Sequence, residues 1–361
     1  MKQHTQKHRG MPRIMLIFSL LLWVGGSQGF GLGSTEASTK GAGDRGRHPA
    51  IAVFIPGVMS GSPIYEMLAE GVKQGAAEKS NSQREVTVTV IEGGFNQAEW
   101  ESRITALAAS GTYDLIVSSN PSLPAIAASV SAKFPKQRFL LLDGALTGNP
   151  QIYTLRYKQR EQAYMAGHIA ALVTREAGYE TSPGMRVGLV AGQEYPAMNE
   201  VILPGYREGA KQVDPNCTVD FRVVGNWFDA GKGAELAADM IRGGVKVILT
   251  IAGGANEGVV QAAFEAGAKV VWFDTNGYGV RPGTVVGSAV VYQDKAAYEQ
   301  TIRFLEGTLP FGKAELLGVA EGYVDFIEAD SDYEASVSAP IREKQRILIE
   351  QIRSGVLQLD E

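Results

Sequence analysis

The residues with the clearest chemical potential lie where short apolar runs of the sequence end. Asp143 follows the run that begins at Arg138, and Asp274 follows the run that begins at Val270. A carboxylate can accept hydrogen bonds from ligand hydroxyls and ring N–H groups. Two carboxylates at a defined spacing can also act as the acid and base of a glycosidase. These residue types therefore point to a binding site for a hydroxylated ligand or to hydrolytic chemistry.

Aromatic and amide side chains follow other apolar runs. Trp227 and Phe228 are adjacent in an expected loop, where exposed aromatic side chains are unfavourable unless something covers them. Aromatic faces stack on planar rings, so the set suits a planar ring that carries a hydroxylated tail. The candidate ligand-binding residues are Tyr65, Asn120, Asp143, Tyr195, Asn199, Trp227, Asp229, Gly254, Asn256, Asp274 and Tyr278.

Each of these assignments has a structural alternative. Asn and Asp at strand ends commonly cap helices or form turns, with no ligand involved. Trp227 could pack between two parts of the chain, and Tyr65 could pack within its helix. The residues alone leave these alternatives open.

The elements that must position these residues alternate between strands and helices. Apolar runs predict strands at residues 51–56, 86–91, 115–118, 138–143, 187–191, 219–224, 245–250, 270–274 and 285–291. Helical spacing predicts helices at residues 64–76, 100–108, 124–133, 160–175, 200–213, 231–242, 256–266, 296–305 and 341–352. The alternation predicts an α/β fold with two successive Rossmann-like units, each a parallel sheet covered on both faces. Ligands of such sheets lie beyond the carboxyl ends of the strands.

Composition argues against several classes of protein. The 361 residues include 34 Lys and Arg against 39 Asp and Glu, so no excess positive charge is available to bind nucleic acid. The single cysteine, Cys217, cannot form an internal disulfide, and His168 is the only histidine beyond the N-terminal 49 residues. Histidine catalysis and a multi-histidine metal site are therefore disfavoured. Walker, nucleophile-elbow and dinucleotide motifs are lacking, so we expect no enzyme, cofactor or metal.

The N-terminus is typical of an export signal. Basic residues precede an apolar run at residues 14–24, and small residues follow it, which predicts a signal peptide over residues 1–29. Residues 30–49 are rich in Gly, Ser and Thr, which predicts a flexible tether. An uncleaved membrane anchor and a start at Met11 remain alternatives. The lack of a cysteine near the cleavage site argues against lipid attachment there.

Several stretches between residues 50 and 326 together match one known family. They are Phe139-Leu-Leu-Leu-Asp-Gly, residues 157–172, Val187-Gly-Leu-Val-Ala-Gly, Gly205-Tyr-Arg-Glu-Gly-Ala-Lys, Trp227-Phe-Asp-Ala-Gly-Lys-Gly, Gly253-Gly-Ala-Asn-Glu-Gly and Phe273-Asp-Thr-Asn. With these motifs the chain resembles the basic membrane protein family. Its members are substrate-binding components of ABC importers, and the best-known ones bind purine nucleosides.

The resemblance implies a type I periplasmic binding protein fold with three interlobe crossings. The N-terminal lobe would comprise residues 50–156 and 293–318, and the C-terminal lobe residues 157–292 and 319–361. A small-molecule ligand would lie between the lobes of a periplasmic monomer, with tethering to the inner membrane as an alternative. The implied partners are the permease and ATPase subunits of an ABC importer.

Departures from the family bear on the ligand. The family's acidic stretch after the first strand is replaced by residues 59–65, which keep the aromatic Tyr65 but lack the acidic pair. A late family lysine is replaced near Val291. A more neutral site favours riboflavin, as in the spirochaetal riboflavin-binding branch, with the flavin ring stacked on Trp227 or Tyr65. The alternative within the family is a purine nucleoside. A secreted nucleosidase using Asp143 and Asp274, and a sensor subunit, are the other hypotheses.

Overall fold

A computed structural model describes residues 48–178 and 184–360. The predicted signal peptide and residues 30–47 of the predicted tether lie outside the described residues. No helix within the described ranges is long and apolar enough to cross a membrane.

The strands of the first half of the chain and the late strand β11 form a parallel sheet with the strand order β11-β5-β4-β3-β1-β2. All six residues of β1 are buried, because helices cover both faces of the sheet. This explains why β1 reads as a continuous apolar run rather than an alternating one. The strands are β1 (Ala50–Ile55), β2 (Thr87–Glu92), β3 (Leu115–Ser119), β4 (Arg138–Leu142), β5 (Ile152–Tyr157) and β11 (Ala314–Leu317).

Two pairs of helices enclose this sheet. On one face, Leu68 and Val72 of α1 pack beneath the sheet with α8, and both side chains are fully buried. On the other face, Trp100 of α2 and Leu123 of α3 pack in a separate apolar cluster. We call the sheet and these helices the first lobe. The helices are α1 (Pro63–Lys79), α2 (Gln97–Ala109), α3 (Leu123–Lys133) and α8 (Gln293–Leu305).

The second lobe contains a sheet with the order β12-β10-β9-β8-β6-β7, in which only β12 pairs antiparallel. Helices α4 and α5 pack together on one face, and α6 and α7 on the other. The strands are β6 (Arg186–Ala191), β7 (Thr218–Val223), β8 (Val247–Ile251), β9 (Lys269–Asp274), β10 (Val285–Val291) and β12 (Val324–Phe326). The helices are α4 (Gln159–Glu176), α5 (Leu203–Val213), α6 (Ala230–Arg242), α7 (Asn256–Glu265), α9 (Ser331–Ser336) and α10 (Ala339–Arg353).

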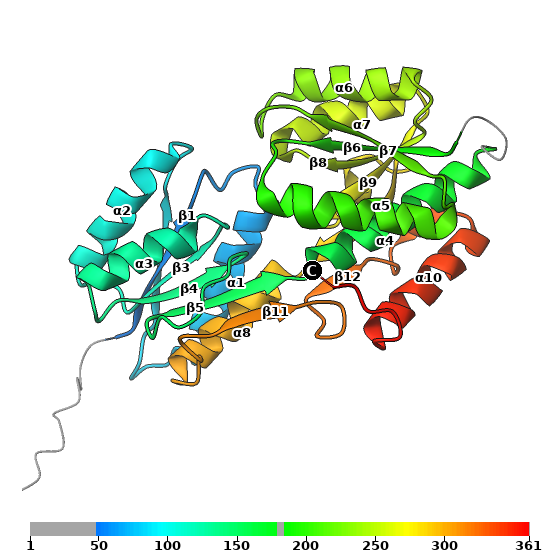
Figure 1. The fold of residues 1–361 in the computed structure, drawn as a ribbon. Helices are drawn as coiled ribbons and strands as arrows, with labels where there is room; N and C mark the ends of the chain where they lie inside the picture. The colour runs from blue at the N-terminus through cyan, green and yellow to red at the C-terminus, as the bar shows by residue number, and fades with distance from the viewer. Residues whose placement is uncertain (1–47, 179–183, 361) are drawn as a thin grey trace, which may run out of the picture. The chain divides into compact units, whose positions relative to one another are not determined.

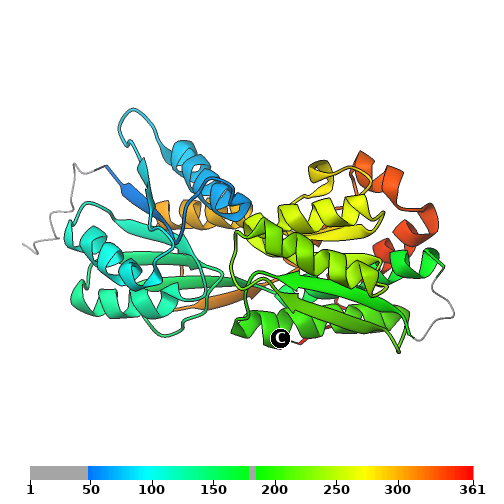
Figure 2. The same ribbon diagram turned by 90° about the horizontal axis from the view of Figure 1, so that it is seen from above.

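The two sheets share the same order of five strands. Five strands follow the order β2-β1-β3-β4-β5 in the first lobe and β7-β6-β8-β9-β10 in the second. Figures 1 and 2 show the two sheets with their covering helices, and the carboxyl ends of the parallel strands are directed toward the other lobe. Residues at equivalent strand ends therefore approach the same space from opposite sides.

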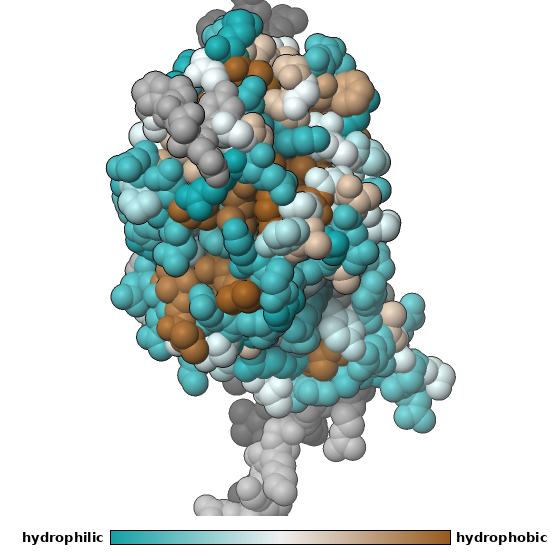
Figure 3. Space-filling view, turned by 90° about the vertical axis from the view of Figure 1, so that its right-hand side faces the viewer, coloured by the Kyte–Doolittle hydropathy of each residue, from teal (hydrophilic) through white to brown (hydrophobic). Residues whose placement is uncertain are grey.

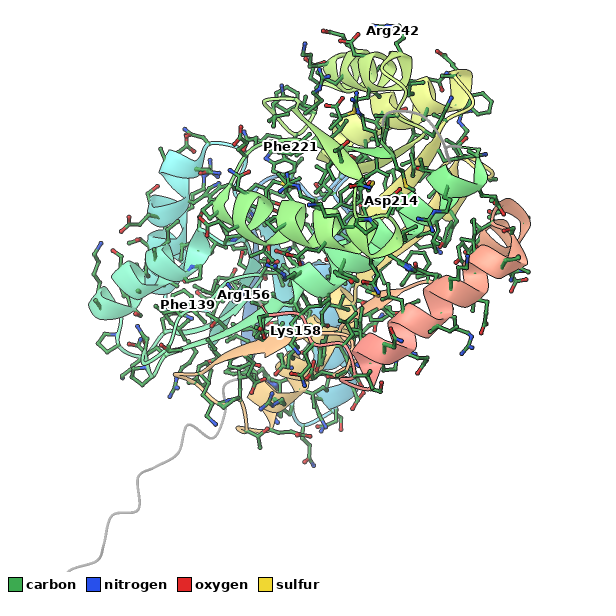
Figure 4. All side chains as sticks on the ribbon, turned by 45° about the vertical axis from the view of Figure 1, so that its right-hand side comes forward. Phe139, Arg156, Lys158, Asp214, Phe221 and Arg242 are labelled. Carbon is green, nitrogen blue, oxygen red and sulfur yellow. The ribbon has the colours of Figure 1, made fainter. Side chains whose placement is uncertain are left out.

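Three connections join the lobes within the described residues: β5 to α4, β10 to α8, and β11 to β12. Backbone hydrogen bonds link these connections to one another. The Lys158 amide donates to the Leu317 carbonyl at 2.9 Å, and the Tyr292 amide donates to the Tyr323 carbonyl at 2.9 Å. Figure 4 shows Arg156 and Lys158 close together where β5 passes into α4. The crossings thus form one hydrogen-bonded group that can act as a hinge.

The predicted α/β fold is confirmed, and the differences have physical causes. Strand β5 was not predicted, because it mixes apolar residues with Thr154 and Arg156. One of its polar groups has a partner far away in the sequence: the Tyr153 hydroxyl donates to Glu315 Oε2 at 2.6 Å. Strands β11 and β12 have four and three residues, too short for a clear pattern. The helix predicted from residue 200 begins as a π-helical turn, Met198–Ile202.

The surface of the second lobe near α10 is mostly hydrophilic. Figure 3 views the side on which α10 lies in Figure 1, and separate apolar patches interrupt the hydrophilic residues. Within α10 the apolar residues Ile341, Leu348 and Ile349 are buried, while Ile347 is 45% exposed. The helix therefore packs by one face, as its spacing predicts.

Candidate functional site

Two carboxylates occupy equivalent strand ends with the same unusual backbone. Asp143 follows β4 with φ +54°, and Asp274 ends β9 with φ +70°. Among the described residues these are the non-glycine positions in the left-handed region, which L-residues adopt only at a cost. Backbone conformations of this kind concentrate at functional sites, because the surrounding structure must hold them in place. The repeat of the fold thus delivers one carboxylate from each lobe.

Both carboxylates interact electrostatically with the same two tyrosines. Burial raises the pKa of Tyr195, and the charges of Asp274 and Asp143 raise it further. Burial likewise raises the pKa of Tyr157, again with contributions from Asp143 and Asp274. Tyr157 ends β5 in the first lobe, whereas Tyr195 follows β6 in the second. Asp143 and Asp274 therefore face a common region between the lobes.

Asp274 is held by a buried amide. Gln162, in the first turns of α4, donates from Nε2 to Asp274 Oδ1 at 3.1 Å and to the Ala289 carbonyl at 3.0 Å. Burial raises the pKa of Asp274 to about 6, and the Gln162 hydrogen bond opposes part of that rise. A carboxyl group with this pKa is mostly ionised at neutral pH and becomes protonated in mild acid.

Tyr65 and Asn120 join Asp143 on the first lobe. The Tyr65 hydroxyl donates to the Pro56 carbonyl at 3.3 Å. Burial raises the pKa of Tyr65 to about 12; a hydrogen bond with Asn120 opposes the rise and the charge of Asp143 adds to it. Asn120 Oδ1 also accepts from the Ser122 amide at 2.9 Å, which shapes the turn before α3. Asn120 thus stabilises a turn and also contacts Tyr65.

The indole ring of Trp227 packs against the backbone of Gly192, at the end of the second sheet. A Cβ atom at Gly192 would lie 2.5 Å from Trp227 Cε3, so only glycine lets the indole lie there. The indole Nε1 donates to Gln193 Oε1 at 3.1 Å, and its ring centroid is 6.1 Å from that of Tyr195. The Gly254 amide donates to the Trp227 carbonyl at 2.8 Å. Trp227 nevertheless remains 38% exposed, so it presents an aromatic surface beside Tyr195.

Three other predicted residues hold local structure. Asp229 caps α6, with Oδ1 accepting from the Lys232 amide at 2.8 Å. Asn256 Oδ1 accepts from the Thr250 hydroxyl at 2.6 Å and from the Ala252 amide at 2.7 Å. Asn199 is exposed and donates to Glu194 Oε2 at 3.1 Å. In both Asp229 and Asn256 the Oδ1 atom is engaged in these local contacts.

Tyr278 does not join the group. It is fully buried; its hydroxyl donates to the Ile327 carbonyl at 2.8 Å and accepts from the Ser288 amide at 3.1 Å. Its ring lies 5.5 Å from that of Tyr333. Tyr278 is a packing residue whose polar atom is satisfied inside the second lobe.

The potentially reactive residues are inert in their surroundings. His168 is buried and within 2.7 Å of Gln345 Oε1, and burial lowers its pKa. Burial also raises the pKa of Cys217 to about 11, so the thiol stays protonated at neutral pH. Within the part of the chain that the structure describes, no group of three or more His, Cys, Asp or Glu residues could hold a metal ion.

Sequence reasoning missed Gln162 and Tyr157. Gln162 lies inside a helix, 112 residues from the Asp274 carboxylate that it contacts, and nothing in its neighbourhood signals the contact. Tyr157 belongs to the unpredicted strand β5. A strand-end search would have included Tyr157 had β5 been recognised.

Comparison with known proteins gives a consistent result. The sequence model of one family, described as "ABC transporter substrate-binding protein PnrA-like", matches residues 48–358. Basic membrane protein D of Borreliella burgdorferi is 31% identical over 173 residues, 47% of this chain and 48% of that protein. The alignment with this curated relative thus spans about half the length of each chain.

Two further relatives have names that mention a ligand. An ABC transporter nucleoside-binding protein of Lactococcus lactis is 28% identical over 151 residues, 42% of this chain and 40% of that protein. A purine-binding protein of Brucella abortus is 29% identical over 188 residues, 51% of this chain and 49% of that protein.

A solved structure shows the same fold. An ABC transporter solute-binding protein of Aeropyrum pernix superposes with a TM-score of 0.75 at 22% identity, covering 86% of this chain and 93% of that one. The arrangement of two parallel-sheet lobes is therefore shared with type I solute-binding proteins.

Proposed function

Because the chain belongs to the family of PnrA-like ABC transporter substrate-binding proteins, we propose that it captures a purine nucleoside between its two lobes. Membership makes it a substrate-binding protein and not an enzyme, and we therefore assign Asp143 and Asp274 to binding rather than catalysis. The observation that carries the proposal is geometric: Asp143 and Asp274 lie at equivalent strand ends of the two sheets with the same left-handed backbone, and those ends are directed toward the other lobe. Carboxylates in that arrangement can accept hydrogen bonds from the adjacent hydroxyls of a ribose.

The comparisons support the nucleoside better than riboflavin. Two relatives are named for nucleoside or purine binding, and none of the names reported above supports a flavin. The missing acidic pair at residues 59–65 had favoured riboflavin through a more neutral site. Asp143 and Asp274, which lie in stretches that match the family, were already among the candidate binding residues. The proposed site thus still contains two acids, one from each lobe.

We further propose that the protein is exported and works outside the cytoplasm. The basic residues and apolar run of residues 1–29 motivate this, together with membership of a family of importer components. The partners would be the permease and ATPase subunits of an ABC importer.

Binding without turnover tests the proposal. The full chain is titrated with inosine, guanosine, adenosine and riboflavin in a calorimeter, and each mixture is then analysed by chromatography. We expect stoichiometric binding of at least one purine nucleoside and no product. Binding of riboflavin alone would refute the nucleoside assignment, and sustained product formation would refute the binding function.

Replacing Trp227 with leucine should weaken nucleoside binding by about 1 kcal/mol, because leucine keeps apolar area but loses the aromatic stack. Gly192→Ala should have a similar effect without touching the ligand, since its Cβ atom would displace the indole. Dissociation constants from calorimetry check both variants. Unchanged affinity in Trp227→Leu would exclude ring stacking on this residue.

Nucleoside binding should bring the lobes together about the three crossings. A ligand shifts an open–closed equilibrium only by its differential affinity for the two states, and contacts from both lobes form together only in the closed one. Small-angle scattering should show a smaller radius of gyration with saturating nucleoside than without it. An unchanged radius, for a free protein shown to be open, would mean that one lobe holds the ligand alone.

A further inference from the structure

The loop after β2 is built like the loop after β7, its equivalent in the second lobe. The Gly94 amide donates to the Gly57 carbonyl at 2.9 Å, and the Gly225 amide donates to the Gly192 carbonyl at 2.9 Å. Gly94 and Gly225 both have positive φ, +67° and +94°. Each pair joins the loop after the edge strand to the glycine that follows the neighbouring strand, β1 or β6. The repeat of the fold therefore extends into these loops.

Each loop then places an aromatic residue directly before a helix cap. Phe95 precedes Asn96, whose side chain caps α2 by accepting from the Ala98 amide at 3.3 Å. Phe228 precedes Asp229, the cap of α6. In the second lobe the Trp227–Phe228 pair borders the site through Tyr195. By its place directly before the cap, Phe95 is the first-lobe counterpart of Phe228.

Contacts tie Phe95 to the site independently of the repeat. A Cβ atom added at Gly57 would lie 3.7 Å from Phe95 Cε1 and 3.4 Å from Tyr65 Cε2, so both rings border this glycine. Tyr65 in turn lies within the electrostatic reach of Asp143. Phe95 is 68% exposed, so its ring is accessible to a ligand.

We propose that Phe95 contacts the base of the bound nucleoside from the first lobe, opposite the Trp227–Phe228 pair. The inference rests on the proposed function and adds a residue that selects for planar ligands. An aromatic face from each lobe favours a flat, conjugated ring over a saturated ring of similar size. Phe95 is therefore a specificity-determining residue at this site.

Phe95→Ala and Phe95→Leu, made in the full chain, test the assignment with inosine, guanosine and adenosine as probes. We expect a roughly tenfold loss of affinity for the alanine variant and a smaller loss for leucine, which restores apolar area without the ring. Phe264→Ala is the matched control, because Phe264 is 50% exposed on α7 and is covered by the Arg281 guanidinium 4.3 Å from its centroid. This control should bind like the unmodified protein. Thermal unfolding establishes that each variant is folded.

The outcomes separate the two proposals. If the unmodified protein binds none of the nucleosides, the proposed function fails and the assignment of Phe95 falls with it. If the unmodified protein binds and Phe95→Ala binds within twofold of it, the function stands and the assignment of Phe95 is overturned. A loss in Phe95→Ala that Phe264→Ala reproduces would also overturn it, because the effect would not be specific to the site.

Discussion

Removing the carboxylate of Asp274 should weaken nucleoside binding by about 1.5–3 kcal/mol, roughly 10- to 150-fold. A hydrogen bond to a charged group has this range, and a ribose hydroxyl would lose its acceptor. Asp274→Gly is the suitable change, because glycine adopts the φ of +70° without strain whereas alanine does not. Asp143→Gly should behave similarly, since Asp143 occupies the equivalent position. Calorimetric titration of both variants measures the loss.

Two further variants make this result specific. Asp274→Asn keeps the shape and one acceptor oxygen but loses the charge, so its loss of affinity should be smaller than that of the glycine variant. Asp239→Ala removes an exposed acid on α6 that pairs with Arg242, and it should bind normally. Full affinity in both Asp143→Gly and Asp274→Gly would show that the carboxylates do not hold the ligand.

Nucleoside affinity should fall about tenfold between pH 7 and pH 5. Burial raises the pKa of Asp274 to about 6, so the carboxylate that accepts the ligand's hydrogen bonds is progressively protonated over this interval. Titrations at several pH values measure the dependence. Asp274→Asn, which cannot titrate, should show a markedly weaker dependence, and an equal dependence in both proteins would assign the effect to another group.

The stability of the free protein should change in the opposite direction. The pKa of Asp274 is about 6 in the folded state against 3.8 ordinarily, so the folded state binds more protons between these values. The contribution of Asp274 to the free energy of unfolding therefore rises as pH falls from 6 toward 4. Denaturant titrations of the unmodified protein and Asp274→Asn isolate this contribution. Opposite pH trends in affinity and stability would indicate that the Asp274 carboxyl causes both.

Much of the fold followed from local sequence patterns. Strands such as β1 and β8 are buried on both faces, and their apolar runs stand out against the helical spacing of their neighbours. Strand β5 was missed because its polar side chains are paired through contacts distant in sequence, such as Tyr153 with Glu315. A local pattern cannot reveal a partner 162 residues away.

The site was predictable where its residues end strands. Asp274 ends β9, Asp143 directly follows β4 and Trp227 lies in the loop after β7, and the parallel sheets direct these strand ends toward the space between the lobes. The same rule also selected Asp229, a helix cap, and Tyr278, a buried packing residue. Sequence cannot separate these cases, because caps and ligand contacts use the same residue types. Phe95 carries the same signal as Phe228, an aromatic directly before a helix cap, and a comparison of the two loops would have selected it.

A crystal structure of the full chain with a saturating purine nucleoside tests the central claim most directly. We predict the ribose hydroxyls within hydrogen-bond distance of the Asp143 and Asp274 carboxylates, with the base against the indole of Trp227. A nucleoside bound on one lobe alone, away from both carboxylates, would contradict the account.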